Sequence, residues 1–571
     1  MLQVTIIFIL FIFLIGIIGK YLYYVAQKKK MKSDYFFDKL DKAIFKILKL
    51  NKKNMNWKEY SLALFLSNFI MMILAYVILR LQNLIFFNPN NIKDLSADLS
   101  FNTIISFMTN TNLQHYSGET ALSYFSQMVV ITMMMFTSAA TGYSACKAMI
   151  RALCGKKMGN YFVDMTRVIT RVLIPLSLVV GMILVSQGTP QTLDPNITVN
   201  TIEGKLQDIP LGPIASLESI KHIGTNGGGF LGANSSTPFE NPNIITNMVE
   251  MFSMMILPGS CVIVFGLTFF NEKNKRTGII RRKRTLFGDE GRSIFIAMSL
   301  IFVMGLLICF YSESAGNPEL GKLGINQSMG NYEGKEVRFG IAQSSMFSTV
   351  TTAFTTGTVN NMHDTLTPLG GMVPLLNMMI NTVFGGVGVG LMNMLLYVML
   401  TVFICGLMIG RTPEYLGKKI ESREMRLIVI CILLHPVLIL GFSAIAVSVN
   451  SGLAGITNPG YHGLSQVLYE FSSSAANNGS GFEGLSDNNF FWNITTGLAM
   501  FFGRYISIIL QLAIAGSLLS KRYVNETSGT LKTSTVSFGI ITSFIVIIFA
   551  ALTFLPAVSL GPIAEHLVLW R

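Results

Sequence analysis

The sequence predicts an all-α polytopic membrane protein in which four parallel repeats surround a pseudo-fourfold central pore. Each repeat consists of a span, a short pore helix and a returning span, and one extra span lies at each end. Three observations lead to this prediction. Of 571 residues, 51% are hydrophobic and only 13% are charged, whereas soluble domains carry about 25% charged residues. Ten segments are long and apolar. Four loops rich in Gly, Asn, Thr and Ser recur at similar intervals, which indicates internal duplication.

The ten apolar segments each approach or exceed the ~20 residues that cross a bilayer. They lie near 4–26, 61–79, 121–146, 168–187, 244–270, 293–312, 372–409, 427–449, 493–519 and 535–556. The first has no basic residue before it and no small-residue cleavage site, and three lysines follow it at 28–30. We therefore expect a permanent helix with its N-terminus outside, and not a signal peptide.

Basic residues gather in alternate loops. Of the 43 Lys and Arg, 33 lie in the segments 28–58, 147–171, 273–292, 411–426 and 521–532. The positive-inside rule makes these loops cytoplasmic and places the four polar loops on the outer side. The net charge of +13 therefore encodes membrane topology, and we expect no nucleic-acid partner.

These boundaries divide the chain into repeats and flanking segments. The expected order is an N-terminal helix (1–27), a basic cytoplasmic loop (28–59), pore repeat 1 (60–151), pore repeat 2 (165–272), a second basic loop (273–292), pore repeat 3 (293–411), pore repeat 4 (425–520) and a C-terminal helix (533–571).

Each repeat is expected to carry its polar loop at the end of a short re-entrant helix. Such helices are predicted at 97–107, 216–223 and 344–352, and the fourth loop lies within 469–482. A half-helix that points its C-terminus at a site contributes partial negative charge, which favours a cation. The candidate cation ligands are Thr109, Asn110, Thr111, Asn112, Thr225, Asn226, Gly227, Gly228, Thr355, Thr356, Gly357, Thr358, Asn477, Asn478, Gly479 and Ser480.

One position in each loop aligns on a residue that tolerates positive φ. With Asn110, Gly227, Gly357 and Gly479 in register, the separations are 117, 130 and 122 residues. We expect left-handed backbone in the Gly227–Gly229 run, because glycine adopts it without steric cost. Carbonyls turned toward one axis would replace the hydration shell of a monovalent cation. The aligned loops contain no carboxylate ring, which argues against a divalent-cation site built on carboxylates.

Two further features lie in the returning spans. Gly385, Gly386 and Gly388 interrupt the span of repeat 3, either as a non-helical gate or as close helix packing. Arg504 lies within the span of repeat 4, where a charge costs at least ~2.5 kcal/mol, so a functional role is the default expectation and a structural ion pair is the alternative. Gln114 and His115 follow the first loop, where they could contact an ion near the mouth, although a lone His at such a turn is more typical of a hydrogen-bonded or solvated side chain.

Several motifs resemble those of one family, the potassium-binding component of the Kdp-type potassium-transporting ATPase. They are Met108-Thr109-Asn110-Thr111-Asn112, Gly224-Thr225-Asn226-Gly227-Gly228-Gly229-Phe230, Pro238-Phe239-Glu240-Asn241-Pro242, Val359-Asn360-Asn361-Met362-His363-Asp364, Phe384-Gly385-Gly386-Val387-Gly388 and Ser474-Ala475-Ala476-Asn477-Asn478-Gly479-Ser480. The resemblance covers almost the whole chain.

The resemblance implies a high-affinity potassium importer of the bacterial cytoplasmic membrane in which this chain selects K⁺. A separate P-type ATPase, the B component of the complex, would hydrolyse ATP, and the C component and the small F component would complete the assembly. By the same resemblance, Arg504 is the pore-facing Arg below the filter and 385–390 is the gate region. Members of the family often carry an acidic residue before the Phe-Gly-Gly, where this chain has Asn381 and Thr382, so a carboxylate role there does not carry over.

The residues themselves agree with this division of labour. The sequence contains neither a Gly-x-x-x-x-Gly-Lys-Ser/Thr phosphate loop nor the Asp-Lys-Thr-Gly-Thr of an aspartyl-phosphate pump. We therefore expect no ATP or Mg²⁺ bound by this chain. Two alternatives stay open: a stand-alone potassium channel or ion-coupled uptake protein of the same pore superfamily, and a non-transporting membrane scaffold.

Overall fold

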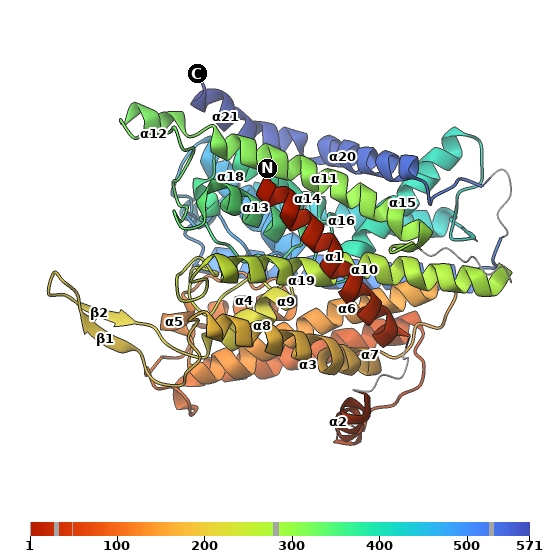
Figure 1. Cartoon of the computed structure of the whole chain (residues 1–571), viewed down its shortest axis with the longest axis horizontal. Helices are drawn as coiled ribbons and strands as arrows, with labels where there is room; N and C mark the ends of the chain where they lie inside the picture. Colours follow the sequence, from red (N-terminus) through yellow and green to blue (C-terminus); the bar gives the residue numbers. More distant parts are fainter. Residues whose placement is uncertain (1, 28–33, 48, 278–284, 525–529) are drawn as a thin grey trace.

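The computed structural model describes residues 2–27, 34–47, 49–277, 285–524 and 530–571. Within these ranges, ten helices are long and apolar enough to cross a membrane, as predicted. The long helices run side by side along the horizontal axis of Figure 1, with the β1–β2 hairpin projecting from one end. Lys28, Lys29 and Lys30, which we expect on the cytoplasmic side, lie outside the described residues.

The first repeat begins at a capping box, in which the side chains of Asn56 and Glu59 each accept a hydrogen bond from the backbone N–H of the other residue. Its elements are α3 (Trp57–Arg80), η1 (Gln82–Leu84), α4 (Ala97–Met108), α5 (Gly118–Ala121), the π-helix η2 (Ser126–Thr132) and α6 (Met133–Leu153). The second repeat consists of α7 (Tyr161–Val168), the π-helix η3 (Ile169–Leu173), α8 (Ile174–Ser186), β1 (Ile197–Asn200), β2 (Leu206–Ile209), α9 (Ile214–Ile223) and α10 (Ile244–Thr277).

The remaining repeats have the same plan. The third consists of α11 (Gly288–Ser314), α12 (Pro318–Lys322), α13 (Gly340–Ala353), η4 (His363–Thr365), α14 (Pro368–Ile380) and α15 (Val389–Met408). A two-residue hairpin, β3 (Glu414–Tyr415) and β4 (Lys418–Lys419), leads to the fourth, which consists of α16 (Ser422–Ser448), α17 (Asn450–Leu453), α18 (Tyr461–Ala476) and α19 (Phe490–Ser520). The short helices α4, α9, α13 and α18 are the four predicted re-entrant helices.

Two spans flank the repeats. At the N-terminus α1 (Leu2–Ala26) packs along α10, and after the fourth repeat α20 (Val536–Val558) packs along α11. The chain then continues through the π-helix η5 (Ser559–Ile563) into α21 (Ala564–Leu569). Each extra span therefore lies against the outside of a neighbouring repeat, where it covers apolar surface of that repeat.

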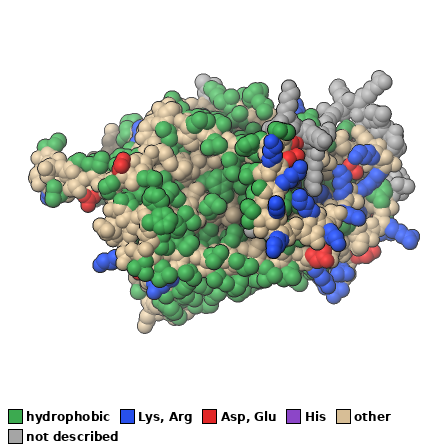
Figure 2. Space-filling model, turned by 90° about the horizontal axis from the view of Figure 1, so that it is seen from below, with side chains coloured by type: hydrophobic (Ala, Val, Ile, Leu, Met, Phe, Trp, Pro, Cys, Tyr) green, Lys and Arg blue, Asp and Glu red, His purple; other side chains and the backbone are tan. Residues whose placement is uncertain are grey.

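The molecule has two chemically different ends. In Figure 2, a band of hydrophobic side chains separates the β1–β2 hairpin from a cluster of Lys and Arg at the opposite end. The hairpin joins α8 to α9, so it lies on the same side as the loops that enter and leave the re-entrant helices. This charge separation along the span direction is the pattern that orients membrane proteins.

Segment 28–59 was expected to be a loop, but it contains the helix α2 (Asp34–Ile47), which projects from the bundle in Figure 1. Three carboxylates spaced along one face of α2 surround the guanidinium of Arg171, which is fully buried in the second repeat. Asp34 lies 2.8 Å from Nε, Asp38 2.6 Å from Nη2 and Asp41 2.7 Å from Nη1. One arginine therefore fastens this helix to the transmembrane part.

Candidate ion filter and gate

The four polar loops meet at one place, which we call the four-loop ring. Positions in loops from all four repeats contact one another there. A Cβ placed on Gly227 would collide with the Thr111 carbonyl oxygen and lie 2.9 Å from the Asn478 carbonyl oxygen. A Cβ on Gly357 would collide with the same Asn478 oxygen and lie 2.7 Å from the Gly227 Cα. All sixteen predicted ligand residues are buried and lie in these loops.

The loops share one backbone design, which corrects the predicted register of the first loop. After each pore helix comes a residue with positive φ, namely Asn110 (68°), Thr225 (51°), Thr355 (48°) and Asn477 (58°). The next N–H bonds back five residues in every loop: Thr111 to Ser106, Asn226 to Lys221, Thr356 to Thr351 and Asn478 to Ser473. Asn112, not Asn110, therefore corresponds to Gly227, Gly357 and Gly479.

The expected left-handed backbone at Gly227–Gly229 is wrong, because none of these three glycines has positive φ. Glycine is needed at these positions because a side chain would collide with neighbouring atoms. Gly357 (97°), Gly479 (103°) and the non-glycine Asn112 (60°) do have positive φ at the corresponding position. At Gly227 the neighbouring backbones leave no room for a side chain, so the close approach of the loops explains the glycine.

Asparagine side chains tie neighbouring loops together around the ring. Asn110 Nδ2 donates to the Thr225 carbonyl oxygen at 2.7 Å, and Asn477 Nδ2 donates to Thr111 Oγ1 at 2.9 Å. Asn478 Nδ2 donates to the Thr351 carbonyl oxygen at 3.1 Å. These bonds fix the spacing of the loops, so the ring is preorganised and does not depend on one loop alone.

The motif between the two prolines at 238 and 242 also supports the ring. Glu240 is fully buried and accepts hydrogen bonds from the backbone N–H of Leu231 and of Ser235, both at 2.9 Å. Those residues follow the glycine run of the second loop. The carboxylate therefore holds the exit of this loop, a role that its position between two prolines did not reveal in the sequence.

The span of repeat 3 is broken, as one of the two sequence interpretations held. Between α14 and α15, Gly385 (63°) and Gly388 (84°) have positive φ, so the chain is not helical there. The Gly385 N–H donates to the Ala353 carbonyl oxygen at 2.8 Å, and the Val387 N–H donates to Thr225 Oγ1 at 3.0 Å. The broken segment therefore lies directly against the second and third loops, and simple packing of a continuous helix is excluded.

Asn381 ends α14 in a left-handed conformation with φ of 47°. Its Nδ2 donates to the Ala476 carbonyl oxygen at 3.2 Å, while its Oδ1 accepts from Thr355 Oγ1 at 3.2 Å. A carboxylate at this position could not make the first of these bonds. The amide thus joins the ends of the third and fourth pore helices.

Arg504 of α19 is buried beside the broken segment. Its Nη2 donates to the Ser138 carbonyl oxygen at 3.3 Å, and a Cβ on Gly142 would lie 2.8 Å from Nη2 and 3.0 Å from the Val387 carbonyl oxygen. Among the described residues no carboxylate forms an ion pair with it, and its Nε has no hydrogen-bond partner. The structural ion pair that the sequence left open is therefore not formed within the described chain.

Four re-entrant loops contributed by one chain, lined by carbonyls and amides and backed by a broken helix, define a single-chain membrane protein of the four-repeat pore class. The potassium-transporting ATPase A subunit family matches residues 5–567. The chain belongs to this family.

Individual relatives span the whole chain. A Clostridium acetobutylicum potassium-transporting ATPase potassium-binding subunit is 55% identical, with 100% of both chains covered. The proteins of the same name from Staphylococcus haemolyticus and Geobacillus kaustophilus are each 52% identical, covering 99% of this chain and 100% and 99% of their own, respectively. Among solved structures, the potassium transporter TrkH from Vibrio parahaemolyticus is 14% identical with a TM-score of 0.48, covering 76% of this chain and 83% of its own.

Proposed function

We propose that this chain is the potassium-binding and selectivity subunit of an ATP-driven potassium import complex. It binds K⁺ from the outer side in the four-loop ring and passes it to a P-type ATPase partner, the B component, with the C component and the small F component completing the complex. The bacterial cytoplasmic membrane is its location. The convergence of four loops from four repeats on one point is the observation that carries this proposal.

The chemistry of the ring suits a monovalent cation. It offers backbone carbonyls such as those of Thr111 and Asn478, together with side-chain hydroxyls and amides, and none of its sixteen residues carries a charge. Neutral oxygen ligands replace the hydration shell of an alkali ion without trapping it as carboxylates would. The name of the relatives, potassium-binding subunit, agrees with this choice of ion.

The broken segment and Arg504 supply a barrier beneath the ring. The guanidinium stays protonated in proteins, and among the described residues no carboxylate offsets its charge. It opposes the passage of a cation straight through the pore, which suits a protein that hands its ion to an energy-coupled partner. Gly385 and Gly388, which both have positive φ, give the segment beside it the freedom to change conformation.

Two measurements test the proposal. Purified chain should bind ⁸⁶Rb⁺ or Tl⁺ in competition with K⁺, and Na⁺ should compete weakly. The chain coexpressed with the neighbouring reading frames should copurify with a P-type ATPase whose ATP hydrolysis K⁺ stimulates. Potassium flux through the isolated chain in liposomes, without any ATPase, would instead identify a stand-alone channel, and an absence of ion binding would identify a scaffold.

A further inference from the structure

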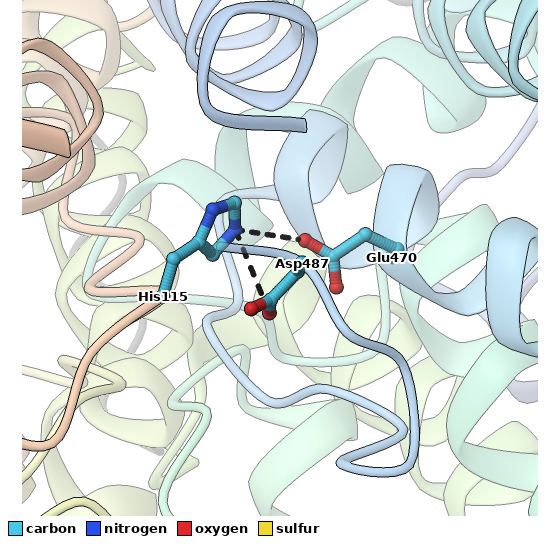
Figure 3. Close-up of side chains that lie close together, drawn as sticks. All are labelled: His115, Glu470 and Asp487. Atoms are coloured by element: carbon cyan, nitrogen blue, oxygen red, sulfur yellow. Dashed lines mark hydrogen bonds and ion pairs between the residues drawn. The ribbon is translucent and has the colours of Figure 1, made fainter. Parts of the chain in front are cut away.

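Three side chains outside the four-loop ring converge on one point between the first and fourth repeats (Figure 3). His115 follows the first loop, Glu470 lies on α18 and Asp487 follows the fourth loop. His115 Nε2 lies 3.2 Å from Glu470 Oε1 and 3.7 Å from Asp487 Oδ2. One potential ligand atom from each residue lies within 4.8 Å of the other two.

The orientation of the imidazole is fixed by Asn493 of α19. Asn493 Nδ2 donates to Asp98 Oδ2 at 2.8 Å, so its Oδ1 is the atom 2.7 Å from His115 Nδ1. An amide oxygen only accepts, which places a proton on Nδ1. In the neutral imidazole, Nε2 therefore faces the two carboxylates with its lone pair, and either a proton on Nε2 or a cation bound between the three groups offsets their charge. A ring nitrogen held by a neighbour while the other points at ligand oxygens is the usual arrangement of a metal-bound His.

Charge and geometry both suit a bound cation. The side chains of His115 and Glu470 are 0% and 2% exposed, and buried carboxylates require a compensating charge. A charge-assisted N–H···O bond to a proton on Nε2 would span about 2.7–2.9 Å. Two ligands ~2.0–2.1 Å from a tetrahedral Zn²⁺ lie about 3.4 Å apart. The separations of 3.2 Å and 3.7 Å from His115 Nε2 lie on either side of ~3.4 Å, and both are longer than a charge-assisted hydrogen bond.

We propose that His115, Glu470 and Asp487 form a binding site for a divalent transition-metal ion such as Zn²⁺, separate from the potassium site. Nε2 and one oxygen of each carboxylate are the protein ligands, and water completes a tetrahedron. The side chain of Asp487 is 25% exposed, which gives the ion a route from the solvent. An imidazole ligand favours transition metals over Mg²⁺ and Ca²⁺.

The consequence of metal binding is mechanical. His115 lies three residues after Asn112 of the first loop, and Glu470 belongs to the helix that carries the fourth loop. A metal held between them clamps the exit of the first loop to the fourth pore helix. The ion would therefore stiffen the side of the four-loop ring at which the first and last repeats meet.

The test is Zn²⁺ binding to the chelator-treated full chain in detergent, in excess K⁺, by isothermal titration and by counting bound metal after desalting. We expect about one Zn²⁺ per wild-type chain, a higher melting temperature with Zn²⁺, and no displacement by equimolar Mg²⁺. Glu470→Gln and Asp487→Asn should each weaken binding at least tenfold. Asp487 lies on a loop, so its variant tests the site even where the Glu470 variant fails to fold.

His462→Gln is the matched control. This histidine also lies between two carboxylates, but Glu565 faces Nδ1 and Asp364 faces Nε2, so the oxygens do not converge on one nitrogen. The His462→Gln variant should bind Zn²⁺ as the wild type does. Absence of stoichiometric Zn²⁺ in the wild type, or wild-type affinity in both carboxylate variants, would overturn the proposal and leave a protonated His115 in an ion pair. Rubidium binding is unaffected in either case, which separates this outcome from failure of the potassium site.

Discussion

Gly227 and Gly479 face each other in the four-loop ring so closely that a Cβ on either would lie 2.8 Å from the Cα of the other. The second and fourth loops therefore touch through bare backbone. Gly227→Ala must push these backbones and the Thr111 carbonyl apart. We expect the preference for K⁺ over Na⁺ to fall by about tenfold or more, equivalent to ~1.4 kcal/mol, while the protein still folds.

Competition of Na⁺ against ⁸⁶Rb⁺ binding measures this change. Gly441→Ala is the control, because Gly441 lies within α16 and a Cβ there meets no atom within 4 Å. An unchanged ion preference in well-expressed Gly227→Ala would refute the role of close backbone contact in selectivity.

The two glycines that flank Val387 in the broken span of repeat 3 differ in the space around them. Gly388 has φ of 84° and a Cβ there would lie 2.7 Å from Cys146 Cβ, whereas a Cβ on Gly386 would have ordinary contact, 3.5 Å from Thr225 Oγ1. Gly388→Ala should therefore strain the segment by ~1–2 kcal/mol and slow transport, with ⁸⁶Rb⁺ binding retained. Gly386→Ala serves as its partner control and should transport nearly normally. Equal transport in the two variants would contradict a gate at this segment.

Arg504 has no anionic partner among the described residues, and the proposed barrier depends on its charge. We expect Arg504→Ala to loosen the coupling between K⁺ and ATP hydrolysis in the complex and to increase downhill leak, because the cationic barrier is gone. Arg504→Lys keeps the charge and should preserve most of the barrier. Potassium flux in proteoliposomes, measured alongside ATP hydrolysis, distinguishes the variants. Wild-type coupling in the Ala variant would exclude the barrier.

His462 predicts a pH dependence of stability. Burial disfavours its charged form, but Asp364 and Glu565 outweigh this and raise its pKa from 6.5 to about 10. A raised pKa in the folded state gives stability that is complete below about pH 6.5 and is lost as pH rises toward about 10. The melting temperature of the wild type should therefore fall between pH 7 and pH 10 by more than that of His462→Gln. Parallel pH profiles would show that this ion pair contributes nothing.

Arg171 should decide whether α2 stays docked. Removing one member of a buried ion cluster leaves uncompensated charges and costs about 3–5 kcal/mol, so Arg171→Met should release α2 and expose it to protease. Asp38→Asn is the milder comparison, since that side chain is 53% exposed and exposed pairs contribute ~1 kcal/mol or less. Limited proteolysis followed by mass spectrometry measures both. Equal protection of 34–47 in the two variants would contradict the docking role.

The sequence was sufficient for the spans, the four re-entrant helices and the membership of the ring. Hydrophobic length and the positions of polar loops are local signals, and the fourfold repetition supplied the arrangement around one axis. The break near Gly388 was also foreseeable as one of two outcomes, because a cluster of glycines in a span permits both a kink and close packing. Only the backbone angles separate these alternatives.

Other features depend on contacts between residues far apart in the chain. The partners of Arg171 lie 130 to 137 residues before it, and Glu470 lies 355 residues after His115. The register of the first loop was missed because Asn110 and Asn112 both adopt positive φ, so residue type alone did not distinguish them. The sequence did not reveal that Gly227 lacks a positive φ, because a glycine can be required either for its backbone conformation or for the space that a side chain would fill.

The break between α14 and α15 carries a consequence for how such a pore is encoded. In an assembly of four identical chains, symmetry would repeat any helix break in every copy. Here the four quarters are written separately in one gene product, so the third can lose its continuous helix while α6, α10 and α19 keep theirs. Fusion of the repeats thereby lets one quarter of the pore differ in backbone from the other three, so that the pore has one distinct side.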